Sequence, residues 1–102
     1  MKKINLGCFD KKLPGFTNVD IREDVNPDIV DDIFKLEKFK DGSVDLIYCS
    51  HALEHLDYEE TEKALNNWYR VLKPKGTIRL SVPDLEAIFS HYIYYKDLNS
   101  MM

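Results

Sequence analysis

The sequence predicts an α/β fold with a mostly parallel β-sheet, and two features of the chain support this prediction. Residues 43–49 form a near-continuous apolar run, which is typical of a parallel strand buried on both faces. After Asp57 the apolar residues recur at helical spacing, and residues 77–82 then alternate as a further strand. Strands that alternate with a helix in this way fit a layered sheet with right-handed crossovers.

Three segments earlier in the chain also have the composition of strands. Residues 2–6 and 16–21 are short and largely apolar, and residues 28–33 form a weaker third segment. Parallel neighbours are usually joined by a crossover of about a dozen residues or more, commonly helical. Pro14-Gly15 disfavours a helix in residues 7–16, so we expect an irregular loop or a single turn there.

Two helices are expected in the second half of the chain. The first begins with Asp57 as N-cap and Glu60 in the capping-box position, and it ends where proline and glycine follow in residues 73–76. A second helix would start after Asp84 as its cap. Its apolar stripe consists of Leu85, Ile88, Phe89, Tyr92 and Ile93.

Length and composition limit the possible classes of function. The 102 residues correspond to one domain, and no segment approaches the roughly 20 apolar residues that a membrane helix needs. A net charge of −4 argues against a nucleic-acid partner. The beginning of the chain does not resemble a signal peptide, so we expect a cytoplasmic protein. Cys8 and Cys49 lack the spacing of a disulfide framework or a zinc site, and no metal is expected.

The junction between residues 43–49 and the following helix carries the side chains most suited to chemistry. Ser50, His51, Glu54 and His55 follow the strand directly. In an open parallel sheet the ligand crevice lies outside the carboxyl ends of the strands, so these side chains are expected to face bound molecules.

Several motifs together make the chain similar to a known family. They are Ile4-Asn5-Leu6-Gly7-Cys8, Leu13 to Ile21, Val30-Asp31-Asp32-Ile33, Asp41 to Ile47, Leu53-Glu54-His55-Leu56 and Arg70 to Thr77. In their order and separation the chain resembles the class I S-adenosylmethionine-dependent methyltransferases, in particular small ones that begin with a Leu-Gly-Cys-Gly loop.

This resemblance implies a Rossmann-like fold with strand order 3-2-1-4-5 and flanking helices. Residues 1–102 would form a single, truncated methyltransferase domain that lacks the usual last strands. The fifth strand would then be an open sheet edge. We therefore expect a homo-oligomer through that edge or through the C-terminal helix.

The resemblance also implies an S-adenosylmethionine site. Gly7, followed by Cys8, would let the backbone approach the cofactor closely. Asp20, followed by Ile21, ends the second strand and would accept hydrogen bonds from both ribose hydroxyls. The remaining cofactor residues are Asp32 near the adenine amino group, with Asp31 as an adjacent rival, Ile33 as an apolar wall, and Ser50.

The residues at the junction would lie on the acceptor side of the site. His51 is the candidate catalytic residue, because an imidazole titrates near pH 6.5 and could act as a general base. A backbone-bonded histidine at a helix start is the alternative. Glu54 and His55 match a frequent pair in the family and are expected to support the next loop. The methyl acceptor, a small molecule or a macromolecule, is not identified by the sequence.

Phe9 stands where the family usually has a second loop glycine. If this position requires a positive φ, the side chain costs about 1 to 2 kcal/mol and could crowd the methionine end of the cofactor. A methyltransferase-fold binding or regulatory module without catalysis is therefore an alternative. Another is a zinc hydrolase, because residues 51–55 read H-x-x-E-H, although such enzymes need a third protein ligand.

Overall fold

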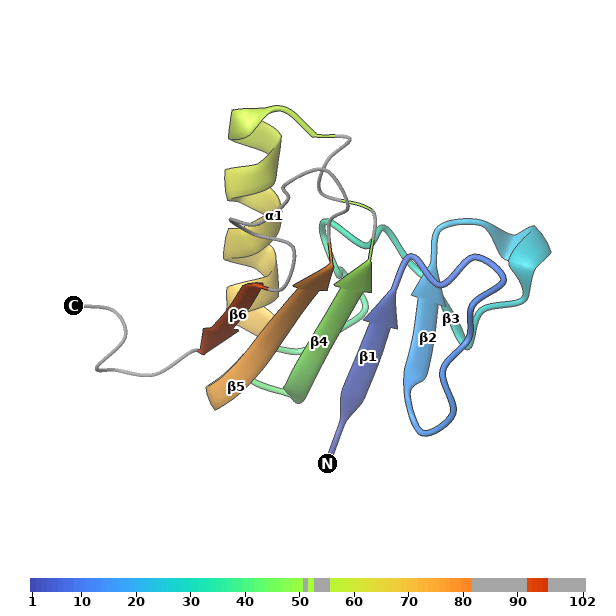
Figure 1. Ribbon diagram of the computed structural model, residues 1–102, viewed down its shortest axis with the longest axis horizontal. Helices are drawn as coiled ribbons and strands as arrows, with labels where there is room; N and C mark the ends of the chain where they lie inside the picture. The colour runs from blue at the N-terminus through green and yellow to red at the C-terminus, as the bar shows by residue number, and fades with distance from the viewer. Residues whose placement is uncertain (51, 53–55, 82–91, 96–102) are drawn as a thin grey trace.

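The computed structural model describes residues 1–50, 52 and 56–81 and the backbone of 92–95. In this part of the chain the centre is a six-stranded sheet of order β3-β2-β1-β4-β5-β6 (Figure 1), parallel except for β6. The strands are β1 (Lys3–Leu6), β2 (Thr17–Asp20), β3 (Ile29–Val30), β4 (Val44–Ser50), β5 (Leu72–Ser81) and β6 (Tyr92–Tyr95). The predicted α/β class and the strand order 3-2-1-4-5 are confirmed.

The predicted helix after Asp57 is present as α1 (Tyr58–Val71), and a short 3-10 helix, η1 (Glu23–Val25), follows β2. Asp57 Oδ1 accepts a hydrogen bond from the Glu60 amide at 2.8 Å, and Glu60 Oε1 accepts one from the Asp57 amide at 3.0 Å. This reciprocal capping box satisfies two amides that the first turn leaves without partners. No helix among the described residues is long and apolar enough to span a membrane.

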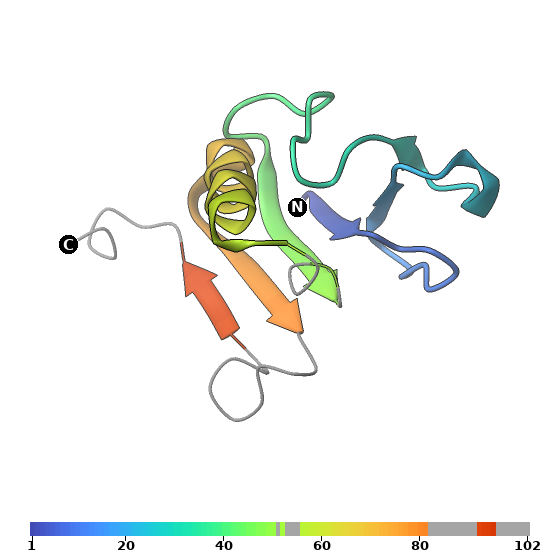
Figure 2. The same ribbon diagram turned by 90° about the horizontal axis from the view of Figure 1, so that it is seen from above.

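One face of the sheet is covered by α1 and by the connection between β3 and β4 (Figure 2). Trp68 of α1 is fully buried, and its Nε1 donates to the Ile33 carbonyl at 2.6 Å. Arg70 donates to the carbonyls of Lys35, Leu36 and Phe39, which fixes the connection against the helix. The core lies between these layers and includes Ile4, Leu6, Val19, Ile47, Ile78 and Leu80.

The connection between β1 and β2 has no helix, as predicted, and a buried amide network holds it in place. Asn5 Nδ2 donates to the Lys11 carbonyl at 3.1 Å and to Asn18 Oδ1 at 2.9 Å. Asn18 Oδ1 also accepts from the Leu13 amide, and both nitrogens of Asn18 donate to Asp28 Oδ2. These bonds satisfy backbone amide and carbonyl groups of the loop, which a crossover helix would have satisfied through its own hydrogen bonds.

The Asp28 carboxylate gives this network a pH dependence. Hydrogen bonds from the Asn18 amide and side chain hold the pKa of Asp28 below its ordinary value. Their contribution to stability is therefore present above the unfolded pKa of about 4 and is lost as the pH falls through the lower folded pKa. We expect Asp28→Ala to destabilise the fold by about 1 kcal/mol at pH 7 and by less at pH 3, measured by urea unfolding. An equal loss at both pH values would contradict this assignment.

Two predictions about the C-terminal region are wrong. Tyr92 and Ile93, placed in a second helix by their spacing, belong to β6, while residues 84–91 lie outside the described part of the chain. The edge of β5 is also not open, because β6 pairs with it from Leu80↔Tyr92 to Thr77↔Tyr95. Residues 92–95 are aromatic or β-branched, and such residues favour strands. The outer edge of β5 offers them a pairing partner, which the helical spacing in the sequence does not reveal.

The extents of two strands, β3 and β5, also differ clearly from prediction. The segment expected over residues 28–33 forms only two residues of strand, β3. β5 begins directly at the end of α1, although residues 73–76 were expected to form a turn. Residues 73–76 lie within the strand and still interrupt its pairing. Leu72 pairs with Val44 and Thr77 with Leu46, so the residues between Leu72 and Thr77 bulge out of the ladder.

Candidate functional site

The carboxyl ends of the parallel strands meet at one edge of the sheet, and Gly7 lies there directly after β1 (Figure 1). Gly7 has φ 69°, and its amide donates to the Val19 carbonyl at 2.8 Å. A Cβ at this position would lie 3.3 Å from Ile33 Cδ1. Glycine therefore satisfies a backbone requirement and permits close packing, and two of the predicted cofactor residues, Gly7 and Ile33, are brought together.

Asp20 ends β2 beside this glycine loop, and its carboxylate is fixed in orientation. Oδ2 accepts a hydrogen bond from the Phe9 amide at 2.9 Å, and Oδ1 accepts one from the Arg22 amide at 3.0 Å. The side chain is buried, while the following Ile21 is 60% exposed. A carboxylate has about four lone-pair sites, so two acceptor sites remain for ligand hydroxyl groups.

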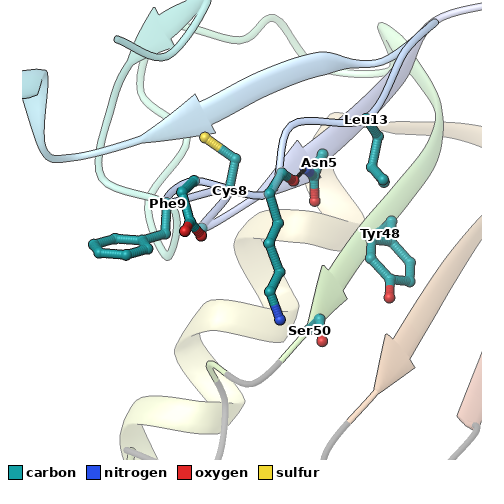
Figure 3. Close-up of a pocket in the computed structure, with 9 residues that line it drawn as sticks. Asn5, Cys8, Phe9, Leu13, Tyr48 and Ser50 are labelled. Atoms are coloured by element: carbon teal, nitrogen blue, oxygen red, sulfur yellow. Dashed lines mark hydrogen bonds between the residues drawn. The ribbon is translucent and has the colours of Figure 1, made fainter. Parts of the chain in front are cut away.

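Phe9 has a positive φ of 45°. This is the backbone conformation that makes a side chain costly at the position of the family's second loop glycine. Its ring points away from Asn5, Tyr48 and Ser50 (Figure 3). The Arg22 guanidinium lies 4.9 Å from the ring centroid, and Arg22 also forms an ion pair with Asp24. The side chain therefore does not crowd those three residues, and the cation–π contact offsets part of the backbone strain.

Two substitutions at Phe9 separate strain from stacking. Phe9→Ala removes the ring contact but keeps a Cβ at positive φ, so we expect a loss of about 0.5 to 1 kcal/mol. Phe9→Gly removes both the contact and the strain, and should be about 1 kcal/mol more stable than the alanine variant. Thermal unfolding of the three proteins measures both differences. A glycine variant that is less stable than the alanine variant would show that no strain is stored at residue 9.

The predicted adenine side of the site follows β3. Asp31 is buried, and its Oδ2 accepts from the Lys38 amide at 2.9 Å. Asp32 is half-buried, and its Oδ1 accepts from the Phe34 amide at 2.9 Å. Both carboxylates hold a backbone amide, but Asp31 is the more buried, which leaves Asp32 as the better candidate of the two for a ligand.

Cys8 and Ser50 lie on either side of the same region. Burial, with a further contribution from the Asp20 charge, raises the pKa of the Cys8 thiol, which favours the neutral thiol over the nucleophilic thiolate. Ser50 is the last residue of β4 and is half-buried. His51, Glu54 and His55 lie outside the described residues, so their roles stay predictions.

A pocket of about 380 Å³ opens beside this edge, under the loop that follows β1 (Figure 3). Gly7, Cys8 and Ser50, which are three of the predicted cofactor residues, line it. Its lining also includes Asn5, Asp10, Lys11 and Tyr48, which the sequence did not single out. Two signals were available: Asn5 is a polar residue in a buried strand, and Tyr48 precedes Ser50 by the two-residue period that puts both on one face of β4.

Comparisons with known proteins agree with this arrangement. A family model described as a methyltransferase domain matches residues 14–80. A solved structure from Pyrococcus horikoshii has a TM-score of 0.70 at 25% identity, covering 82% of this chain and 50% of that one. A SAM-dependent methyltransferase from Archaeoglobus fulgidus has a TM-score of 0.70 at 23% identity, covering 86% of this chain and 47% of that one.

A curated relative extends the similarity at the sequence level. An uncharacterised protein of Methanocaldococcus jannaschii is 38% identical over 56 residues, which are 55% of this chain and 24% of the relative. The chain thus spans about half the length of the solved structures it matches and about a quarter of this relative. The matched family model and the strand order lead to one conclusion: the chain belongs to the methyltransferase-domain family and has the class I methyltransferase fold.

Proposed function

We propose that this chain binds S-adenosylmethionine and takes part in the transfer of its methyl group to an acceptor. The observation that carries the proposal is the Asp20 carboxylate, which is held by the amides of Phe9 and Arg22 beside the glycine loop. An acidic group at the end of the second strand is suited to the two ribose hydroxyls of a nucleoside.

The surrounding residues fit the other parts of this cofactor. Ile33, packed close to Gly7, and the exposed Ile21 offer apolar contacts to an adenine ring. Asp32 has one carboxylate oxygen, Oδ1, engaged with the Phe34 amide, and the other would accept a hydrogen bond from the adenine amino group. When bound, the cofactor supplies an activated methyl group on a sulfonium.

The acceptor side is assigned to the end of β4. Ser50 borders the pocket there, and its hydroxyl would orient a polar group of the acceptor. His51 follows in the sequence as the proposed general base, needed only if the acceptor must lose a proton during transfer. The proposed acceptor is a small molecule or a macromolecule.

Calorimetric titration with S-adenosylhomocysteine tests the cofactor assignment. We expect one binding site per chain, and competition with S-adenosylmethionine. Protein that is folded by circular dichroism and binds neither compound would overturn the proposal. Adenosine serves as the matched ligand for the nucleoside part of the site.

A binding or regulatory module without catalysis is the second candidate, supported by Phe9, which stands at positive φ where the family usually has its second loop glycine. Cofactor binding without methyl transfer to any member of an acceptor library would favour this candidate. The H-x-x-E-H alternative would require zinc, which metal analysis of the purified chain detects directly. Membership of the methyltransferase-domain family favours the first candidate over the hydrolase.

We also propose that the protein is cytoplasmic and that it has no nucleic-acid partner. The net charge of −4 supports the second of these proposals. A homodimer remains a proposal as well. Since β6 occupies the β5 edge, a dimer would have to use another surface, and the predicted C-terminal helix lies largely outside the described residues. Light scattering of the purified chain measures the oligomeric state.

A further inference from the structure

The face of the sheet opposite α1 carries polar side chains at the end of β4. Tyr48 and Ser50 line the pocket there, whereas Ile47 and Cys49 are buried in the core. Successive side chains of a strand point to opposite faces, so Tyr48 and Ser50 point away from the core. Figure 3 shows these two residues one after the other along β4. Their surroundings on the neighbouring strand indicate what else this face can bind.

The register of β4 and β5 extends this polar area by two residues. Tyr48 pairs with Arg79, and Ser50 pairs with Ser81. Paired residues of neighbouring strands lie about 4.8 Å apart and share a face, and residues two apart along one strand are separated by about 7 Å. The four side chains therefore occupy the corners of one small area, which we call the β4–β5 polar patch (Tyr48, Ser50, Arg79 and Ser81).

Arg79 differs from the two other arginines of the chain in having no carboxylate partner in the described part. Arg22 forms an ion pair with Asp24, and Arg70 forms one with Asp41, both at 2.8 Å. The Arg79 side chain is exposed, and no described residue forms an ion pair or a side-chain hydrogen bond with it. Its donors are therefore available to a ligand.

The neighbours of Arg79 on this face are uncharged. Tyr48 pairs with it on one side and Ile93 on the other, and Thr77 and Ser81 are two residues away along β5. The hydroxyl groups of Tyr48, Thr77 and Ser81 form no hydrogen bond with a described residue. A positive charge among free hydroxyl groups, with no carboxylate next to it, favours an anion on this part of the sheet.

The geometry of the guanidinium group indicates which anions fit. Its donors form a planar fork that matches a carboxylate or a phosphate, and each neighbouring hydroxyl group can add one donor. Asp10 and Lys11, which line the loop side of the pocket, carry opposite charges, so the positive charge of the area comes from Arg79. A phosphate and a carboxylate share this chemistry, and experiment separates them.

We propose that the β4–β5 polar patch binds an anionic group of the methyl acceptor, a phosphate or a carboxylate, and that Arg79 selects it. In the sheet order β1 and β4 separate Asp20, at the end of β2, from Arg79 on β5. The acceptor and the nucleoside therefore have different places along the same sheet. This inference rests on the proposed function, because it takes the anionic ligand to be the methyl acceptor.

NMR titration with methyl phosphate and with acetate tests the patch directly, in the presence and absence of S-adenosylhomocysteine. The backbone amides of Ser50, Arg79 and Ser81 serve as reporters. We expect saturable shifts of these amides, and the anion that binds more tightly identifies the group that the acceptor carries. The absence of a saturable shift with both anions would overturn the inference.

Variants on one strand test the role of Arg79. Arg79→Met should weaken the binding of the anion by about three- to tenfold. Arg79→Lys, which keeps the charge but loses the planar fork, should lie between Arg79→Met and the wild type. Lys75→Met is the matched control, because Lys75 is an exposed cation of β5 outside the patch, and it should change affinity by less than about twofold. Equal losses in Arg79→Met and Lys75→Met would indicate a general charge effect and contradict the assigned role.

Stability distinguishes a ligand site from a structural ion pair. Arg79→Met should leave the midpoint of urea unfolding unchanged, because no described residue depends on the guanidinium. A clearly lower midpoint would show that Arg79 holds part of the fold, and it would contradict the assignment to a ligand.

Two further readouts separate this inference from the proposed function. Arg79→Met should bind S-adenosylhomocysteine as the wild type does, so a failure of the wild type to bind that compound counts against the proposed function, not against the anion site. With an acceptor found in a library, Arg79→Met should raise the KM for the acceptor by about three- to tenfold and leave kcat unchanged. Methyl transfer only to acceptors without a phosphate or carboxylate would overturn the inference while supporting the proposed function.

Discussion

Asp20→Ala is expected to weaken the binding of S-adenosylhomocysteine by about 10²- to 10⁴-fold. Two hydrogen bonds from ribose hydroxyls to a carboxylate contribute about 1.5 to 3 kcal/mol each, and 1.4 kcal/mol corresponds to a factor of ten. Calorimetry measures the change, and adenosine, which has the same ribose, should show a similar loss. Unchanged binding by the folded variant would remove Asp20 from the site.

A matched control is needed because the Asp20 carboxylate also accepts hydrogen bonds from two backbone amides. The alanine variant releases the amides of Phe9 and Arg22, so part of the lost affinity would come from a rearranged loop. Asp24→Ala removes a nearby carboxylate that pairs with the Arg22 side chain. We expect Asp24→Ala to change affinity by less than about threefold, since its ion pair is exposed and contributes little. Equal losses in both variants would indicate that the loop, rather than the Asp20 carboxylate, controls binding.

Local signals in the sequence were sufficient for most of the fold. The capping box at Asp57 and the apolar run in β4 depend on residues close together in the chain, so they could be identified without tertiary information. β6 depends on pairing with β5, and Tyr92 and Ile93 fit a helical stripe equally well when that partner is unknown. Tertiary pairing decided between the two conformations.

In the candidate site, too, some residues could be identified from the nearby sequence, whereas others depend on contacts with distant parts of the chain. Gly7 and Asp20 could be proposed from their positions after apolar segments, and the structure brings their two loops together through the Phe9 amide. The orientation of the Asn5 amide could not be predicted, because it depends on hydrogen bonds to Asn18 Oδ1 and to the Lys11 carbonyl. The orientation of a buried amide is a property of the whole hydrogen-bond network.

Trp68→Ala is expected to be the most destabilising single substitution in the described part of the chain. Trp68 is fully buried, and replacing such a side chain costs about 3 to 5 kcal/mol. A domain of this size is stable by about 5 to 15 kcal/mol, so the variant would keep a small margin or unfold. Urea unfolding followed by circular dichroism measures the loss, because the substitution removes the only tryptophan fluorophore. A loss below 1 kcal/mol would contradict the assigned packing.

Trp68→Phe connects this helix to the candidate site. Phenylalanine keeps most of the buried area but removes the donor to the Ile33 carbonyl, so we expect a loss of about 1 to 3 kcal/mol. Because Ile33 packs next to the position of Gly7, freeing its backbone should also weaken S-adenosylhomocysteine binding, by a few-fold. Tyr58→Phe, on the same helix but 84% exposed, is the control that should change neither stability nor affinity. If Trp68→Phe lowered stability but left affinity intact, the position of Ile33 would not depend on its hydrogen bond to α1. The result would then give no support to Ile33 as a wall of the nucleoside site.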